Sequence, residues 1–145
     1  MRLAPSGLWV GVGGREPPAI RGEPACVVGP ADAIYVNAAL PYPAPAWLVA
    51  LRPGGRLVFP LHGKGGFGGM LRLTRPQAGD AWPARFISRA GFIPCMAPQD
   101  AEDAQRLAAA FAAGGWDKVR SFHRAGPPDD TSWFAGNGWW LSTAE

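Results

Sequence analysis

Two apolar runs separated by an amphipathic stretch define the central part of the chain. Residues 33–36 are continuously apolar, which is typical of a strand covered on both faces in a parallel sheet. In residues 43–51 the apolar positions follow helical spacing, and a Pro-Gly-Gly turn comes next. Residues 56–61 then predict a second apolar strand. Together these segments predict a βαβ unit with a right-handed crossover.

A different pattern begins after the glycine-rich tract at residues 63–69. Leucines alternate with polar residues over residues 70–75, which predicts a half-exposed antiparallel strand. Residues 84–89 repeat this alternation, and residues 92–96 predict a further short extended segment. The second part of the chain is therefore expected to add antiparallel strands to the βαβ unit.

The best-defined helix of the sequence lies near residue 105. Asp100 is a suitable N-cap, and Leu107 and Phe111 fall on one helical face. Gly114 and Gly115 are expected to end this helix, because glycine readily adopts the left-handed conformation found there.

Two strands around a polar loop are expected to finish the chain. They are residues 116–123 and 138–142. Asp129 and Asp130, which follow two prolines, predict a turn between them. Three tryptophans of this region are interpreted as core or sheet-covering residues: Trp133, Trp139 and Trp140.

The first 30 residues have no sustained period, because glycine and proline are scattered through them. This leader is predicted to be mostly loop, with short strands at residues 8–12 and 25–28. The expected organisation is a leader over residues 1–30 and one half-domain over residues 31–145.

The central segment also carries a recognisable combination of features. An apolar strand ends in the small residues Asn37, Ala38 and Ala39, and a short proline-flanked helix leads into the run LRPGGRLVFPL. This combination resembles the protein-L-isoaspartate O-methyltransferase family, whose members have the class I S-adenosylmethionine-dependent methyltransferase fold. Many class I methyltransferases share the Pro-Gly-Gly turn, whereas the alanine pair and the proline after Phe59 favour the narrower family. The resemblance covers mainly residues 31–63.

The resemblance implies an α/β fold that is only partly present. The first apolar strand would be the family's fourth, so three βα units of roughly 30 residues each should precede it. Only 31 residues do. Residues 11–14 contain three glycines, but Glu16 stands where a GxGxxG loop needs its third glycine, and Pro17 opposes a following helix. The expectation is a truncated Rossmann-like methyltransferase sheet, one βαβ unit followed by antiparallel strands and a helix, with the N-terminal strands and cofactor loop missing.

The resemblance also implies where ligands would bind. S-adenosylmethionine would be the cofactor, and an isoaspartyl protein or peptide would be the substrate of this protein-repair reaction. The implied cofactor-binding residues are Asn37, Ala38 and Ala39, and the implied substrate-binding residues are Pro60, His62 and Gly63. No catalytic residue is implied, because an isoaspartyl carboxylate is already anionic and needs no general base.

The missing strands would leave the apolar strand with an unpaired edge, which is a hazard for aggregation. The segment at residues 8–12, a second copy of the chain, or another polypeptide would have to cover it. A second hypothesis is therefore a catalytically inactive remnant or subunit that associates through this edge. Small-molecule binding by the glycine-rich tract is a third, which rests on composition alone.

Composition narrows the class of protein. The chain has 145 residues, 48% of them hydrophobic and 17% charged, with 20 glycines and 16 prolines. These values exclude a disordered chain and a coiled coil, and they oppose a helical bundle. Cys26 and Cys95, the two cysteines, are too few for a disulfide scaffold and lie in no metal-binding motif. No apolar run approaches the length of a membrane span, so a cytoplasmic location is expected.

The formal net charge of +3 raises the question of an anionic partner. Arg56, Lys64, Arg72 and Arg85 could face an anionic substrate or a nucleic acid. Exposed aromatic residues are not interleaved with them, so a solvated strand face is favoured and no nucleic acid is expected. His62 has no acid beside it in the sequence, so an exposed side chain is favoured over a proton carrier.

Overall fold

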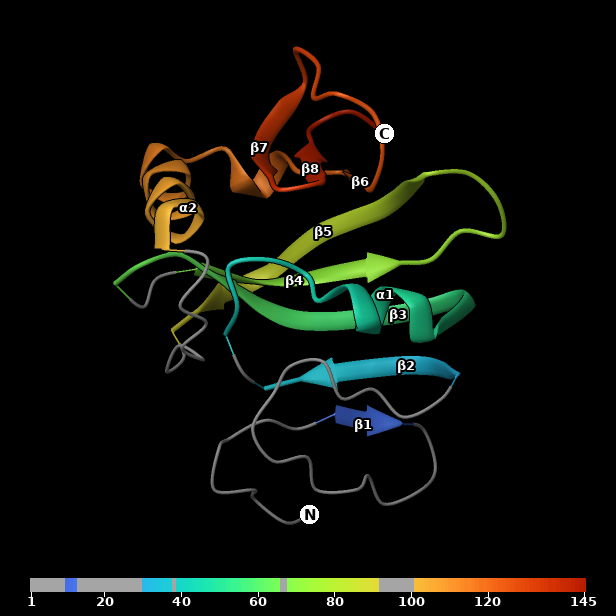
Figure 1. The fold of residues 1–145 in the computed structure, drawn as a ribbon. Helices are drawn as coiled ribbons and strands as arrows, with labels where there is room; N and C mark the ends of the chain where they lie inside the picture. Colours follow the sequence, from blue (N-terminus) through green and yellow to red (C-terminus); the bar gives the residue numbers. More distant parts are fainter. Residues whose placement is uncertain (1–9, 13–29, 38, 66–67, 92–100) are drawn as a thin grey trace.

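The computed structural model describes residues 10–12, 30–37, 39–65, 68–91 and 101–145. Within these residues the chain forms one mixed sheet of eight strands with few helices (Figure 1). The spatial order is β1-β2-β3-β4-β5-β6-β8-β7. The strands are β1 (Val10–Val12), β2 (Ala31–Val36), β3 (Leu51–His62), β4 (Gly68–Thr74), β5 (Ala81–Ala90), β6 (Ser121–His123), β7 (Ser132–Gly136) and β8 (Trp139–Ser142). The helices are α1 (Pro45–Ala50), α2 (Ala101–Ala113) and the short 3-10 helix η2 (Trp116–Lys118).

The predicted βαβ unit is present, but the expectation that its first strand is covered on both faces is wrong, because Ala33 and Tyr35 are exposed. β2 and β3 are parallel neighbours, and α1 connects them. However, β3 begins at Leu51 and not at Arg56, because the Pro-Gly-Gly turn lies inside the strand. The pairing with β2 passes from Leu51 directly to Arg56, so the intervening residues form an irregularity. Gly54 has a φ of 83°, which a residue with a side chain rarely adopts.

The edge of β2 is covered by β1. The two strands pair in antiparallel register, with Val10 opposite Val36 and Val12 opposite Ile34. Of the three ways to cover this edge, pairing by the leader is therefore the one observed. The other residues of the predicted leader strand lie outside the described residues, as do the predicted strands at residues 25–28 and 92–96 and the predicted N-cap Asp100.

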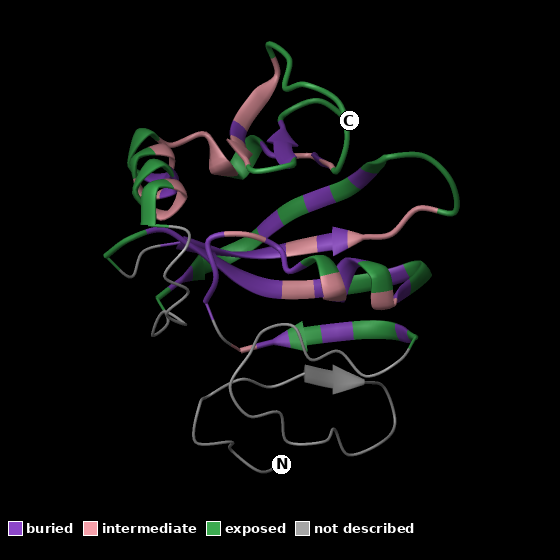
Figure 2. Cartoon of the chain, viewed as in Figure 1, coloured by how far each residue is buried: buried purple, intermediate pink, exposed green. Residues whose placement is uncertain are grey.

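Both longer helices cover the same face of the sheet. Phe59 of β3 lies opposite Leu71 of β4, which lies opposite Phe86 of β5, so these side chains form one row on one face. Trp47 of α1 packs on Phe59 with ring centroids 5.7 Å apart. Phe111 of α2 packs on Phe86 at 5.4 Å. The main apolar core therefore lies between this face and the two helices (Figure 2).

The C-terminal part departs from the prediction. The predicted helix is confirmed as α2, and Gly114 and Gly115 follow it with φ angles of 83° and 80°. The predicted strand at 116–123 is wrong in its first part, because Val119 N donates to the Trp116 carbonyl and closes the turn of η2. β7 was not predicted, so three strands, not two, finish the chain.

The tryptophans of this region have the predicted role. Trp139 and Trp140 are buried, and Trp133 packs against the core. The Trp133 indole N–H also donates to the Gly114 carbonyl at 2.9 Å, which ties β7 to the end of α2. The predicted turn is present too, since Asp129 accepts hydrogen bonds from the backbone N–H and the hydroxyl of Thr131.

Candidate functional site

The carboxyl ends of the two parallel strands meet at one edge of the sheet. After β2 the chain returns to β3, where Leu40 N donates to the Pro60 carbonyl at 3.1 Å and His62 N donates to the Leu40 carbonyl at 2.9 Å. Asn37 is half-buried and Ala39 is 1% exposed just before this bridge. The structure therefore brings the two predicted groups of site residues to the same edge.

α2 lies over the β3 side of this edge. A Cβ atom added to Gly63 would lie 2.4 Å from the backbone nitrogen of Ala108. The next residue, Lys64, donates its backbone N–H to the Ala104 carbonyl at 2.9 Å. Pro60, His62 and Gly63 are all buried. Substrate binding by these three residues stays a prediction, and it requires space for the ligand beside α2.

His62 differs most from its predicted environment. The expectation of an exposed ring is wrong, because His62 is 3% exposed. Its Nε2 lies 3.0 Å from the Ala90 carbonyl, which can only accept, so Nε2 carries the proton. β4 begins beside the ring at Gly68, where an added Cβ would lie 2.7 Å from the imidazole Cδ2. The Gly-Gly pair that opens β4 was the sequence signal for this close approach.

The electrostatics of His62 favour a structural role. Burial lowers the pKa of the imidazole below its ordinary value, and the hydrogen bond to the Ala90 carbonyl partly opposes this effect. The ring is therefore neutral at pH 7. It joins the end of β3 to the end of β5 across β4.

The residues at this edge of the sheet provide only part of a binding site for S-adenosylmethionine. In open α/β sheets the cofactor lies at the carboxyl ends of parallel strands, beside a glycine-rich loop that leads into a helix. Asn37 and Ala39 stand at such an end and provide one wall, while Ala38 lies outside the described residues. β1 is antiparallel and ends at Val12 beside Ile34, so the chain leaves β1 at the amino end of β2. The loop after β1 therefore starts at the wrong edge for this cofactor.

Comparison with known proteins gives no family. No protein-family model matches this chain, and no curated protein matches it either.

Two features are absent from the described residues, a metal-binding cluster and a membrane-spanning helix. No group of three or more His, Cys, Asp and Glu side chains in these residues is placed to share a metal ion. Among the same residues, every helix is too short or too polar to cross a bilayer. The cytoplasmic location stays a prediction.

Proposed function

We propose that this chain is an S-adenosylmethionine-dependent methyltransferase-like protein of the protein-L-isoaspartate O-methyltransferase type, with its ligand-binding edge at the carboxyl ends of β2 and β3. The observation that supports this proposal is the backbone bridge from Leu40 to Pro60 and His62. It draws the segment after β2 against the end of β3, at the position where open α/β sheets bind ligands.

Asn37 is the residue best suited to contact the ligand. Its amide both donates and accepts hydrogen bonds, and it is half-buried next to the edge. In the family, the methyl group passes from the cofactor's sulfonium to an isoaspartyl carboxylate. The chain would then mainly position the two reactants, since the carboxylate needs no general base. A buried, neutral His62 is compatible with such a site.

Calorimetric titration of the full 145-residue chain with S-adenosylmethionine tests the proposal. We expect micromolar binding by the wild type and binding about tenfold weaker in Asn37→Ala, because one hydrogen-bonding side chain is lost. Asn137→Ala is the matched control, since Asn137 is exposed in the turn between β7 and β8. Its affinity should equal that of the wild type. A folded sample without detectable binding would contradict the proposal.

A non-catalytic subunit is the second candidate, and β1 is the observation that favours it. Because β1 pairs with β2, association through the β2 edge, as expected from the sequence, is closed, but β1 also leads the chain away from the proposed ligand edge. β1 and β7 are then the edge strands of the described sheet. A folded chain that does not bind S-adenosylmethionine, and whose solution mass is that of a dimer, is the result expected for this candidate.

A further inference from the structure

The sheet face opposite α1 and α2 carries a row of residues in direct register. Tyr35 of β2 lies opposite Val58 of β3, Val58 opposite Arg72 of β4, and Arg72 opposite Arg85 of β5. Directly opposed residues share a face. Tyr35 and Arg85 are exposed, and Val58 and Arg72 are half-buried. Because both longer helices pack on the other face, no helix of the described residues covers this row.

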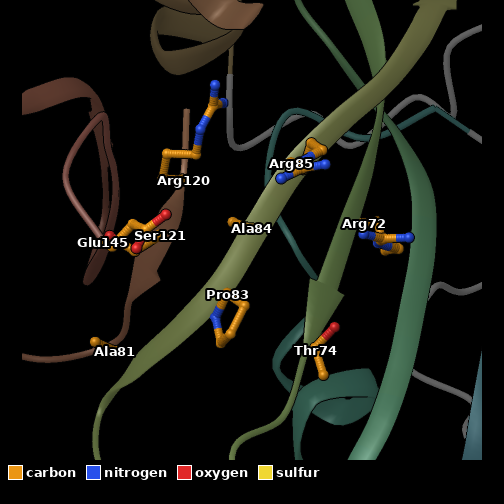
Figure 3. A pocket seen from close by; sticks show the side chains of 9 residues that line it. All are labelled: Arg72, Thr74, Ala81, Pro83, Ala84, Arg85, Arg120, Ser121 and Glu145. Atoms are coloured by element: carbon orange, nitrogen blue, oxygen red, sulfur yellow. The ribbon is translucent and has the colours of Figure 1, made fainter. Parts of the chain in front are cut away.

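A hollow of about 340 Å³ lies over one end of this row. Figure 3 shows β5 in the middle, with Arg72 and Thr74 of β4 on one side and Arg120 and Ser121 on the other. Pro83 of β5 contributes to an apolar floor between them. The hollow therefore combines three guanidinium groups with an apolar surface, which is a usual composition for a small-molecule site.

The arginines of the hollow lack acidic partners in the described part of the chain. The ion pairs found there join Arg52 to Asp32 and Arg106 to Asp103, both away from the hollow. Two arginines placed directly opposite each other on adjacent strands repel, which destabilises the sheet. An anion that contacts both side chains would relieve this repulsion.

The other polar groups that line the hollow are Arg120, Ser121 and Glu145. Arg120 donates from one guanidinium nitrogen to the carbonyls of Asp117 and Val119, both at 2.8 Å, so its side chain is held in place. The Ser121 hydroxyl donates to the Ala144 carbonyl. Glu145 is the acid that lines the hollow, and it is exposed and forms no ion pair with the described arginines. The positive charge of the hollow therefore exceeds the negative charge.

We propose that this hollow binds the oxyanion group, carboxylate or phosphate, of a small molecule, with Arg72 and Arg85 as the main ligands. The guanidinium fork binds either group through paired hydrogen bonds. Thr74 adds a hydroxyl on the same face as Arg72. The volume exceeds that of one oxyanion, so the rest of the molecule lies over the floor at Pro83.

This site is separate from the proposed methyltransferase edge. Arg72 and Thr74 lie opposite Val58 and Arg56, whereas the His62 end of β3 lies opposite Gly68. Either site can therefore bind its ligand when the other does not, and the two tests are independent.

The experiment follows thermal unfolding of the full chain in sodium phosphate, sodium acetate and sodium chloride at equal ionic strength. An anion that binds the folded state raises the Tm, and above its Kd the increase follows the logarithm of the anion concentration. Phosphate also stabilises proteins by exclusion from their surface, so the decisive quantity is the difference between wild type and variants. We expect Arg72→Gln and Arg85→Gln to bind about tenfold more weakly, since each loses a charged hydrogen-bonding group.

Arg56→Gln is the matched control. Arg56 is exposed on the same face but does not line the hollow. Its replacement by glutamine lowers the net charge by the same amount as the two test substitutions. It should retain the wild-type response. If the difference in Tm between wild type and the two variants is larger in phosphate than in acetate, the ligand is a phosphate, and the reverse identifies a carboxylate. Equal Tm increases in wild type, Arg72→Gln and Arg85→Gln, or an equal loss in Arg56→Gln, would overturn the proposal.

Discussion

The two faces of the central strands differ sharply, although the same strands form both. On the helix-covered face, the row Phe59, Leu71 and Phe86 is buried beneath Trp47 and Phe111. The residues adjacent to these along β3, β4 and β5 face the opposite side and form the row Val58, Arg72 and Arg85. The covered face carries the main apolar core, whereas no helix of the described residues covers the opposite face, which we call the open face. The following predictions test this division.

Removing a large side chain from the covered face should have the largest effect. Phe59 is fully buried and its ring contacts Trp47, so Phe59→Ala loses apolar burial and leaves a cavity. We expect the free energy of unfolding to fall by about 3–5 kcal/mol. Chemical denaturation with urea measures this change.

Tyr35→Ala is the control on the open face. Tyr35 lies on the neighbouring strand β2 and is 48% exposed. Its removal should cost less than about 1 kcal/mol, because little apolar area leaves the interior. Equal losses in the two variants would show that the two faces do not differ in their contribution to stability.

The contact between β3 and α2 should give the next largest effect. In Gly63→Ala the added methyl group meets the Ala108 backbone, and α2 must move. Overpacking of this kind destabilises by about 1–3 kcal/mol. Ala108→Gly should not restore stability, because the closest atoms of Ala108 are backbone atoms. Rescue by this second substitution would mean that side chains alone set the contact.

The buried histidine predicts a pH dependence. Below about pH 6.5 the unfolded chain protonates His62, while the folded chain does so only at lower pH because burial lowers the pKa of His62. The free energy of unfolding should therefore decrease as the pH falls from 7, and level off below the folded pKa. Urea unfolding at several pH values between 7 and 5 measures this decrease.

Two glutamine variants separate His62 from the second histidine. His62→Gln keeps an N–H donor for the Ala90 carbonyl but cannot titrate, so the decrease should become shallower. His123→Gln should retain it. An unchanged pH profile in His62→Gln would assign the decrease to other groups.

The open face should show the smallest effect, and one of opposite sign. Arg72→Gln removes the repulsion between Arg72 and Arg85. In a buffer without phosphate or carboxylate anions, the free energy of unfolding should therefore rise by about 0.2–0.5 kcal/mol. The gain should vanish in high salt, which screens the repulsion. A loss of stability would show that Arg72 stabilises the sheet by packing.

Prediction from sequence succeeded where the signal was local. The apolar run before Asn37, the amphipathic stretch and the Gly114-Gly115 pair correctly predicted the βαβ unit and the end of α2. Prediction from sequence failed for β7 and for the buried ring of His62, because their positions depend on strands that are distant in sequence. The hollow on the open face was missed as well. Arg72 and Arg85 were interpreted as a solvated face, since their alignment becomes visible only once β4 and β5 are paired.

The sequence by itself determined the strands and the helix of the βαβ unit, the helix α2 and the residues that stand at the ends of β2 and β3. Alternation and turn chemistry act between neighbouring residues, so they can be read without knowledge of the fold. The tertiary structure decided that β1 covers β2 in antiparallel register and that both helices share one face. It also placed Arg72 opposite Arg85. These outcomes depend on strand order and register, which are set by competition among non-local pairings and not by any single segment.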